Sequence, residues 1–145
     1  MSMSFFLQAF TAAQLEQMRD DPECINTLVD GQQAQAAIDL DYVGDALRIA
    51  LNGVGFASDE MVGEVLSFGC MLVDPELVKV QAAMLARWDQ PRLMARVEEM
   101  YNDEEAEEMP DVQVSGPALW PHFVTLQQFY QQAAQQGWAV LIYLA

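Results

Sequence analysis

Hydrophobic positions along the chain fall into short unbroken runs at both ends and helix-spaced stripes between them. Residues 3–10 are rich in Phe and Leu, and residues 138–145 are apolar without interruption. Short apolar runs are typical of buried strands, and an uninterrupted run favours a central place in a sheet. The pattern predicts that strands at Met3–Phe10 and Ala139–Leu144 lie in one sheet. A third apolar run, residues 68–73, predicts another strand.

Helix-spaced apolar residues fill most of the remaining chain. The expected helices are 11–20, 22–29, 41–51, 58–66, 75–88, 90–100 and 121–136. For the fifth of these, the expected inward stripe consists of Leu77, Val80 or Gln81, Met84, Leu85 and Trp88.

Residues with capping chemistry mark several helix starts. Thr11 followed by Gln14 is a capping-box pattern. The pairs Asp21-Pro22 and Asp74-Pro75 each place a capping carboxylate before a proline suited to the first helical turn. The sum is an α+β fold, with several short helices packed on a small sheet that includes both terminal strands. At this length a single domain over residues 1–145 is expected.

Charge is the most unusual property of the composition. The 145 residues include 22 Asp and Glu against 6 Lys and Arg, which gives a net charge of −16. Such a charge repels nucleic acid and anionic membranes and attracts basic partners. The excess of negative charge comes mainly from the scarcity of Lys and Arg, since only 19% of residues are charged.

The acid residues concentrate in "YNDEEAEEMPD", residues 101–111, which contains no cation. This stretch could be a solvated loop, a surface for a basic partner or a metal site. A run of Glu without Gly or Asn turns lacks the geometry of a calcium cage, so no metal is expected. The residues predicted to contact a partner are Tyr101, Asp103, Glu104, Glu105, Glu107, Glu108, Met109 and Asp111, with Met100 adjacent and Asp39, Asp41 and Asp45 as a second acidic group.

Candidate catalytic residues are few. His122 is the single histidine, and Cys24 and Cys70 are far apart in sequence. A zinc site needs such residues in clusters, and no Gly-x-Ser-x-Gly or Walker motif occurs. "DLDYVGD", residues 39–45, resembles an EF-hand start but has Ala50 where a bidentate Glu is required. No cofactor is expected, and an enzyme with a carboxylate-based site and His122 stays open as the alternative.

Targeting signals are also missing from the sequence. "MSMSFFLQAF" has no basic region before its apolar residues, which argues against a signal peptide. The eight apolar residues at the end are too few for a bilayer, since a spanning helix needs about 20. Two buried free thiols are the expected state of the cysteines. A soluble cytoplasmic protein is predicted.

The segment 109–145 resembles the end of the YfbM-like family of small bacterial proteins. The shared features are a loop with Pro110, a helix with Leu126, Phe129 and Tyr130, then Gly137 and a final hydrophobic strand. "DALRIALNG" and "VDPELVKV" are similar to two further family segments, in the same order. Gly44 and Arg48 stand where the family often shows Trp and His. The resemblance implies an α+β fold and supplies no activity.

These observations predict an acidic cytoplasmic binding protein. The most specific form of this hypothesis is an immunity-type protein that neutralises a basic toxin by covering its cationic cleft. Complementary charge favours tight binding to such a cleft. A housekeeping protein of unknown role is the remaining alternative.

Overall fold

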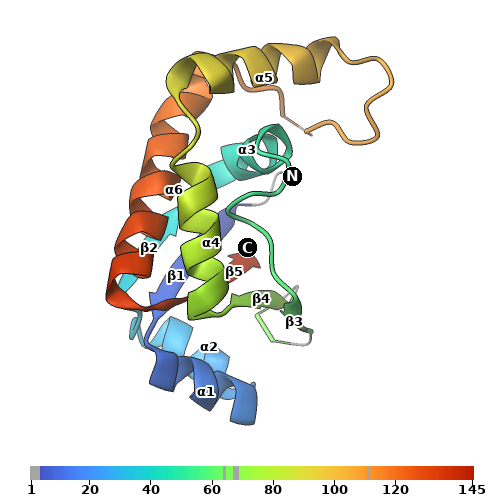
Figure 1. The fold of residues 1–145 in the computed structure, drawn as a ribbon. Helices are drawn as coiled ribbons and strands as arrows, with labels where there is room; N and C mark the ends of the chain where they lie inside the picture. The colour runs from blue at the N-terminus through green and yellow to red at the C-terminus, as the bar shows by residue number, and fades with distance from the viewer. Residues whose placement is uncertain (1–3, 64, 67–68, 111) are drawn as a thin grey trace.

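The computed structural model describes residues 4–63, 65–66, 69–110 and 112–145, in which helices lie on both faces of an antiparallel sheet (Figure 1). The strands are β1 (Phe5–Phe10), β2 (Ala36–Asp39), β3 (Glu60–Val62), β4 (Cys70–Val73) and β5 (Ala139–Leu144). The helices are α1 (Ala12–Asp20), α2 (Cys24–Asp30), the 3-10 turn η1 (Asp41–Val43), α3 (Gly44–Ala50), α4 (Pro75–Leu85), α5 (Gln90–Asn102) and α6 (Gly116–Gln136). Within these ranges no helix is long and apolar enough to cross a membrane. The predicted α+β class is confirmed.

Both terminal strands lie inside the sheet, as predicted. The strand order is β2-β1-β5-β4-β3, and β1 pairs antiparallel with β5 from Phe5 opposite Leu144 to Phe10 opposite Ala139. The continuous hydrophobicity of β5 follows from this central position, because side chains on both of its faces are buried. Met3, the first residue of the predicted strand, lies outside the described residues.

Two hydrophobic clusters occupy the two faces of the sheet. The larger one joins alternate strand residues such as Leu7 and Val140 to α3, α4, α5 and α6. The smaller one joins Phe10, Leu72 and Leu141 to α1 and α2. Alternation along β4 and β5 therefore sends successive side chains into different cores.

Most predicted caps are present. Thr11 forms a complete capping box with Gln14, and Asp74 accepts the backbone N–H of Leu77 at 2.8 Å. Gly137 ends α6 with a left-handed φ of 72°. By contrast, Asp21-Pro22 is not a cap: α2 starts two residues later, at Cys24, and its N-cap Glu23 makes no side-chain capping bond.

Two other expectations about helices are wrong in part. The last helix begins at Gly116 behind the N-cap Ser115, so Pro121 lies within it. The predicted inward stripe of α4 is correct at Gln81 and Leu85, and at Trp88 just beyond the helix. Val80 and Met84 are exposed instead, and the buried face includes Val78 and Ala82. A helix that is apolar nearly all round does not define one face by periodicity, and contact with α6 decides which residues are buried.

The helix predicted over residues 58–66 is also wrong, because Glu60–Val62 form the edge strand β3. The Ser58 hydroxyl, expected at a helix start, donates to the Leu72 carbonyl and accepts the Glu60 N–H at 3.0 Å. That side chain therefore ties the segment to β4. Met61 is 80% exposed, which rules out an inward helical stripe here.

The segment between α3 and β3 is held by two buried polar side chains. Gln81, only 2% exposed, accepts the N–H groups of Gly55 and Ala57 at 2.7 and 3.2 Å and donates to the Ala57 carbonyl at 2.9 Å. Tyr130 donates its hydroxyl to the Gly55 carbonyl at 2.7 Å. Gly55 has φ of 90°, and an added Cβ would lie 3.0 Å from Leu126. These contacts hold the Gly55–Ala57 backbone, which follows the turn at Asn52 that borders the site described next.

Candidate functional site

Helix α5 presents the acidic stretch, and Asp103–Pro110 form a loop that extends away from the body of the protein (Figure 1). The helix begins at the Asp89 cap, ends at Asn102 and has no basic residue in its last turn. The negative end of the helix dipole therefore faces the first carboxylates of the loop with no cation in that turn. This placement costs some stability.

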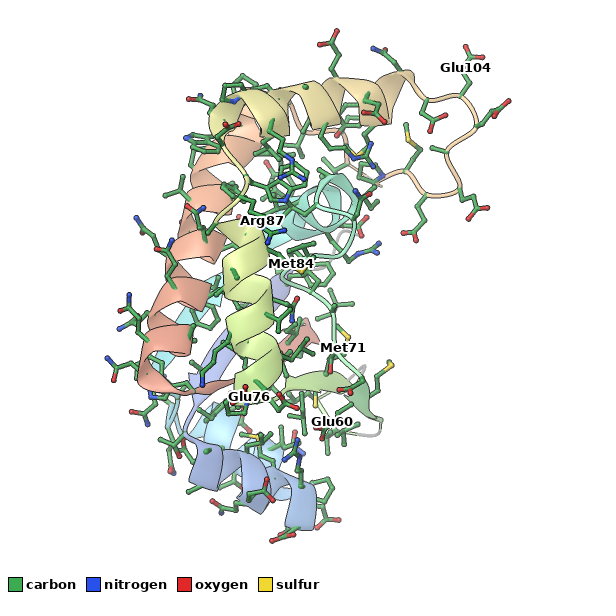
Figure 2. All side chains as sticks on the ribbon, in the orientation of Figure 1. Glu60, Met71, Glu76, Met84, Arg87 and Glu104 are labelled. Carbon is green, nitrogen blue, oxygen red and sulfur yellow. The ribbon has the colours of Figure 1, made fainter. Side chains whose placement is uncertain are left out.

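All five described carboxylates of this acidic loop are exposed: Asp103, Glu104, Glu105, Glu107 and Glu108. Glu104 lies at its outer end (Figure 2). Met109 is 43% exposed and Pro110 is buried. Asp111 lies outside the described residues. The loop thus offers a dense array of carboxylates on a short projecting segment.

Specific contacts hold the acidic loop near its base. The Asp103 carboxylate accepts the Glu105 N–H at 3.0 Å, and Glu108 pairs with Arg48 at 2.9 Å. Tyr101 uses its hydroxyl to accept the Val114 N–H at 2.6 Å, which joins the segments on either side of the loop. The loop therefore has a defined position although its carboxylates are in solvent.

The expected apolar contacts beside the acids are only partly present. Met100 is 2% exposed and belongs to the larger core, so it cannot contact a partner. It lies on the buried face of α5 with Leu93 and Val97. Tyr101 is half-buried, which leaves Met109 as the exposed apolar residue among the three.

Arg48 joins the two predicted acidic groups. Its Nη2 lies 2.9 Å from Asp45 on its own helix and 2.9 Å from Glu108 of the acidic loop. Burial alone would lower the pKa of Arg48, but its hydrogen bonds with these carboxylates raise that pKa above the usual value. The other members, Asp39 at the end of β2 and Asp41 at the start of η1, are exposed, and the Asp39 carboxylate accepts the Asp41 N–H at 2.7 Å.

An open groove of about 560 Å³ lies between the acidic loop and the end of α3. Its lining includes Arg48, Asn52 and Arg96 together with carboxylates of the loop. A second hollow of about 470 Å³ shares Asn52, Arg96 and Asp103 with the first and adds Trp88, Arg92 and Glu99. Three of the chain's six cations therefore border two adjoining hollows.

The arginines of α5 are only partly engaged. Arg96 donates from Nη2 to Asn52 at 3.2 Å, and its Nη1 is 4.0 Å from Glu99. The Arg96 Nε is buried and has no hydrogen-bond partner among the described residues. Arg92 lies 4.1 Å from the Trp88 ring centroid. Sequence reasoning missed Arg92 and Arg96 as a pair, although their spacing of four residues places both on one face of a helix.

The structure does not bring the candidate nucleophiles to the histidine. Cys70 packs with α1 and α2 on one face of the sheet, whereas His122 is on α6, which packs on the other. Both cysteines are free, and burial raises the pKa of Cys70 to about 11. Among the described residues, no group of three or more His, Cys, Asp or Glu is placed to hold a metal ion.

Comparison with known proteins identifies relatives without an assigned activity. The model of a family described as a domain of unknown function, DUF1877, matches residues 1–143. The crystal structure of YfbM from Escherichia coli, a protein of unknown function, matches with a TM-score of 0.67 and 16% identity over 99% of each chain. This likeness shows a shared fold, and the YfbM-like resemblance seen in the sequence is confirmed. Among curated proteins, none matches the chain.

Proposed function

Because the chain belongs to the DUF1877 family, whose description assigns no activity, we propose a function from the site itself: binding of a basic protein partner through the acidic loop. The most specific form of this proposal is an immunity-type role, in which the protein covers the cationic cleft of a toxin and neutralises the toxin. As part of the same proposal, the protein acts in the cytoplasm, where free thiols such as Cys24 and Cys70 stay reduced.

The observation that carries the proposal is the placement of the loop carboxylates. Five exposed acids project from the body, and among the described contacts only Glu108 pairs with a cation. Their mutual repulsion and their position at the negative end of α5 are unfavourable in the free protein. Binding of a cationic surface would offset both the repulsion among the carboxylates and their unfavourable interaction with the helix dipole.

The loop carboxylates would act mainly on the rate of association with the partner. Clustered charge accelerates association with a surface of opposite sign, whereas contacts buried at the interface set the lifetime of the complex. Exposed Met109 and half-buried Tyr101 are the adjacent apolar groups for such contacts.

Capture from native lysate of the source cells tests the proposal. The wild-type chain and a variant with Glu104, Glu105, Glu107 and Glu108 changed to Gln are immobilised, and retained proteins are identified by mass spectrometry. We expect basic proteins on the wild type that are depleted on the variant. A captured toxin would also lose its activity when mixed with the wild-type protein.

A matched control removes the same charge elsewhere. Asp20, Asp21, Glu23 and Asp30 are exposed around α1 and α2, and their amide variants raise the net charge by the same four units. This control should retain the basic proteins. Equal capture by all three proteins would show that total charge or another surface is responsible and would refute the role of the acidic loop.

A further inference from the structure

Another groove lies along α5 and ends where the acidic loop begins. It extends from Met94, which contacts the start of α6, to Asn102, the last residue of α5 (Figure 1). Its volume is about 400 Å³, within the range of about 300–1,000 Å³ that is common for small-ligand sites. This α5–α6 groove is lined by Met94, Val97, Glu98, Tyr101, Asn102, Ser115, Gly116 and Pro117.

The larger side chains that line the α5–α6 groove are mainly apolar. Met94 and Tyr101 are half-buried and Pro117 is exposed, whereas Val97 belongs to the larger core. The Tyr101 hydroxyl already accepts the Val114 N–H at 2.6 Å, so this polar group has a partner within the protein. The groove therefore offers an apolar surface beside the acidic loop, which is where a charge-driven interface needs a buried contact.

The charge beside this groove is negative. Glu98 is the one charged side chain among the described residues that line it, and the acidic loop follows directly at its end. A turn of about 100° per residue places Arg92 and Arg96 about 160° away from Met94 around α5. Both arginines border the hollow of about 470 Å³ instead. An apolar groove with carboxylates beside it complements an apolar side chain that has cations beside it.

We propose that the α5–α6 groove holds a large aliphatic side chain of the basic partner, such as leucine, whose neighbours in the partner's sequence are lysine or arginine. The basic neighbours meet Glu98 and the acidic loop. The inference rests on the proposed binding of a basic partner and adds the apolar anchor of that complex. Met94 suits such an anchor because an unbranched thioether adapts to the shape of the group that it contacts.

Three peptides test this proposal by isothermal titration calorimetry at low salt. They are acetyl-Lys-Arg-Leu-Arg-Lys-amide, the same peptide with Ser in place of Leu, and acetyl-Gln-Gln-Leu-Gln-Gln-amide. The first should bind at least about tenfold more tightly than the Ser peptide, because the Ser peptide buries no aliphatic side chain. It should exceed the neutral peptide by at least the same factor, about tenfold, because the carboxylates then meet no cation.

Methionine methyl signals and two variants locate the leucine. In protein labelled with ¹³C at the methionine methyls, the Met94 signal should shift with the basic Leu peptide and much less with the Ser peptide. Met84, 41% exposed on α4, is the internal control and should not shift. Met94→Gln places an amide in the groove and should bring the Leu and Ser peptides within about twofold of each other, whereas Met84→Gln should leave their ratio unchanged.

Each remaining result overturns the inference. Equal affinity of the basic Leu and Ser peptides would show that the groove does not hold the aliphatic side chain, and the proposed charge-driven binding would still stand if the capture experiment succeeds. Equal affinity of the basic and neutral Leu peptides would show that the carboxylates do not select the occupant. A shift of Met84 in place of Met94 would assign the contact to another surface. Absence of binding by all three peptides up to about 10 mM would remove the site.

Discussion

Replacing Gln81 by Leu is expected to destabilise the protein by about 1.5–4.5 kcal/mol. The side chains have similar size and Gln81 is 2% exposed, so the change removes hydrogen bonds with little change in packing. It deprives the Gly55 and Ala57 N–H groups and the Ala57 carbonyl of their partner. Gly55 is buried, and an unsatisfied buried donor costs about 1–3 kcal/mol, whereas the exposed Ala57 can find water and loses about 0.5–1.5 kcal/mol.

Urea denaturation followed by circular dichroism measures this free energy of unfolding. Gln131→Leu, on the exposed face of α6, is the matched control and should change stability by less than about 0.5 kcal/mol. Tyr130→Phe removes the bond to the Gly55 carbonyl, and its effect should be non-additive with Gln81→Leu because both act on Gly55. A loss below about 0.5 kcal/mol for Gln81→Leu would refute the claim that this residue fixes the segment between α3 and β3.

Three further perturbations have expected outcomes. Because burial raises the pKa of Cys70 to about 11, its thiol stays protonated at pH 8 and should react with Ellman's reagent more slowly than half-buried Cys24, with the rate rising toward pH 11; equal rates in the folded protein would contradict this. Asp74→Ala removes the cap on the Leu77 N–H and should cost about 1 kcal/mol in urea unfolding, and no loss would show that the cap is dispensable. Deleting Ala139–Leu144 removes the central strand and should abolish soluble expression; a soluble, folded product would refute its structural role.

The parts of the fold that the sequence predicted are those where one local signal dominates. β1 and β5 are apolar runs too short for helices, and the caps at Thr11, Asp74 and Gly137 need only neighbouring backbone groups. These features do not depend on distant contacts. They emerged with nearly correct boundaries for that reason.

The failures occurred where long-range contacts decide the outcome. Ser58 bonds to Leu72, fourteen residues away, and thereby turns a helix-like segment into β3. Gln81, which periodicity could not separate from Val80, is buried because its amide meets Gly55 and Ala57. A sequence pattern cannot show which backbone groups will need a partner.

The sequence predicted the acidic loop of the candidate site but missed the groove beside it. Clustered carboxylates and the absence of nearby cations in sequence indicate an exposed loop, as the structure has it. The groove depends on α3 and α5 meeting, so Arg48, Arg96 and Asn52 come together only through tertiary packing. Met100 was expected to contact a partner, but it lies on the same buried face of α5 as Leu93 and Val97.

The most direct test of the acidic loop is the association rate with a captured basic protein, measured by stopped flow at increasing salt. Between about 0.01 M and 0.15 M salt the Debye length falls from about 30 Å to about 8 Å, so wild-type association should slow markedly. The variant with Gln at 104, 105, 107 and 108 should associate more slowly at low salt and show a flatter dependence, with an unchanged circular dichroism spectrum. Equal rates for both proteins across this range would contradict the account and direct attention to the acids at 39, 41 and 45.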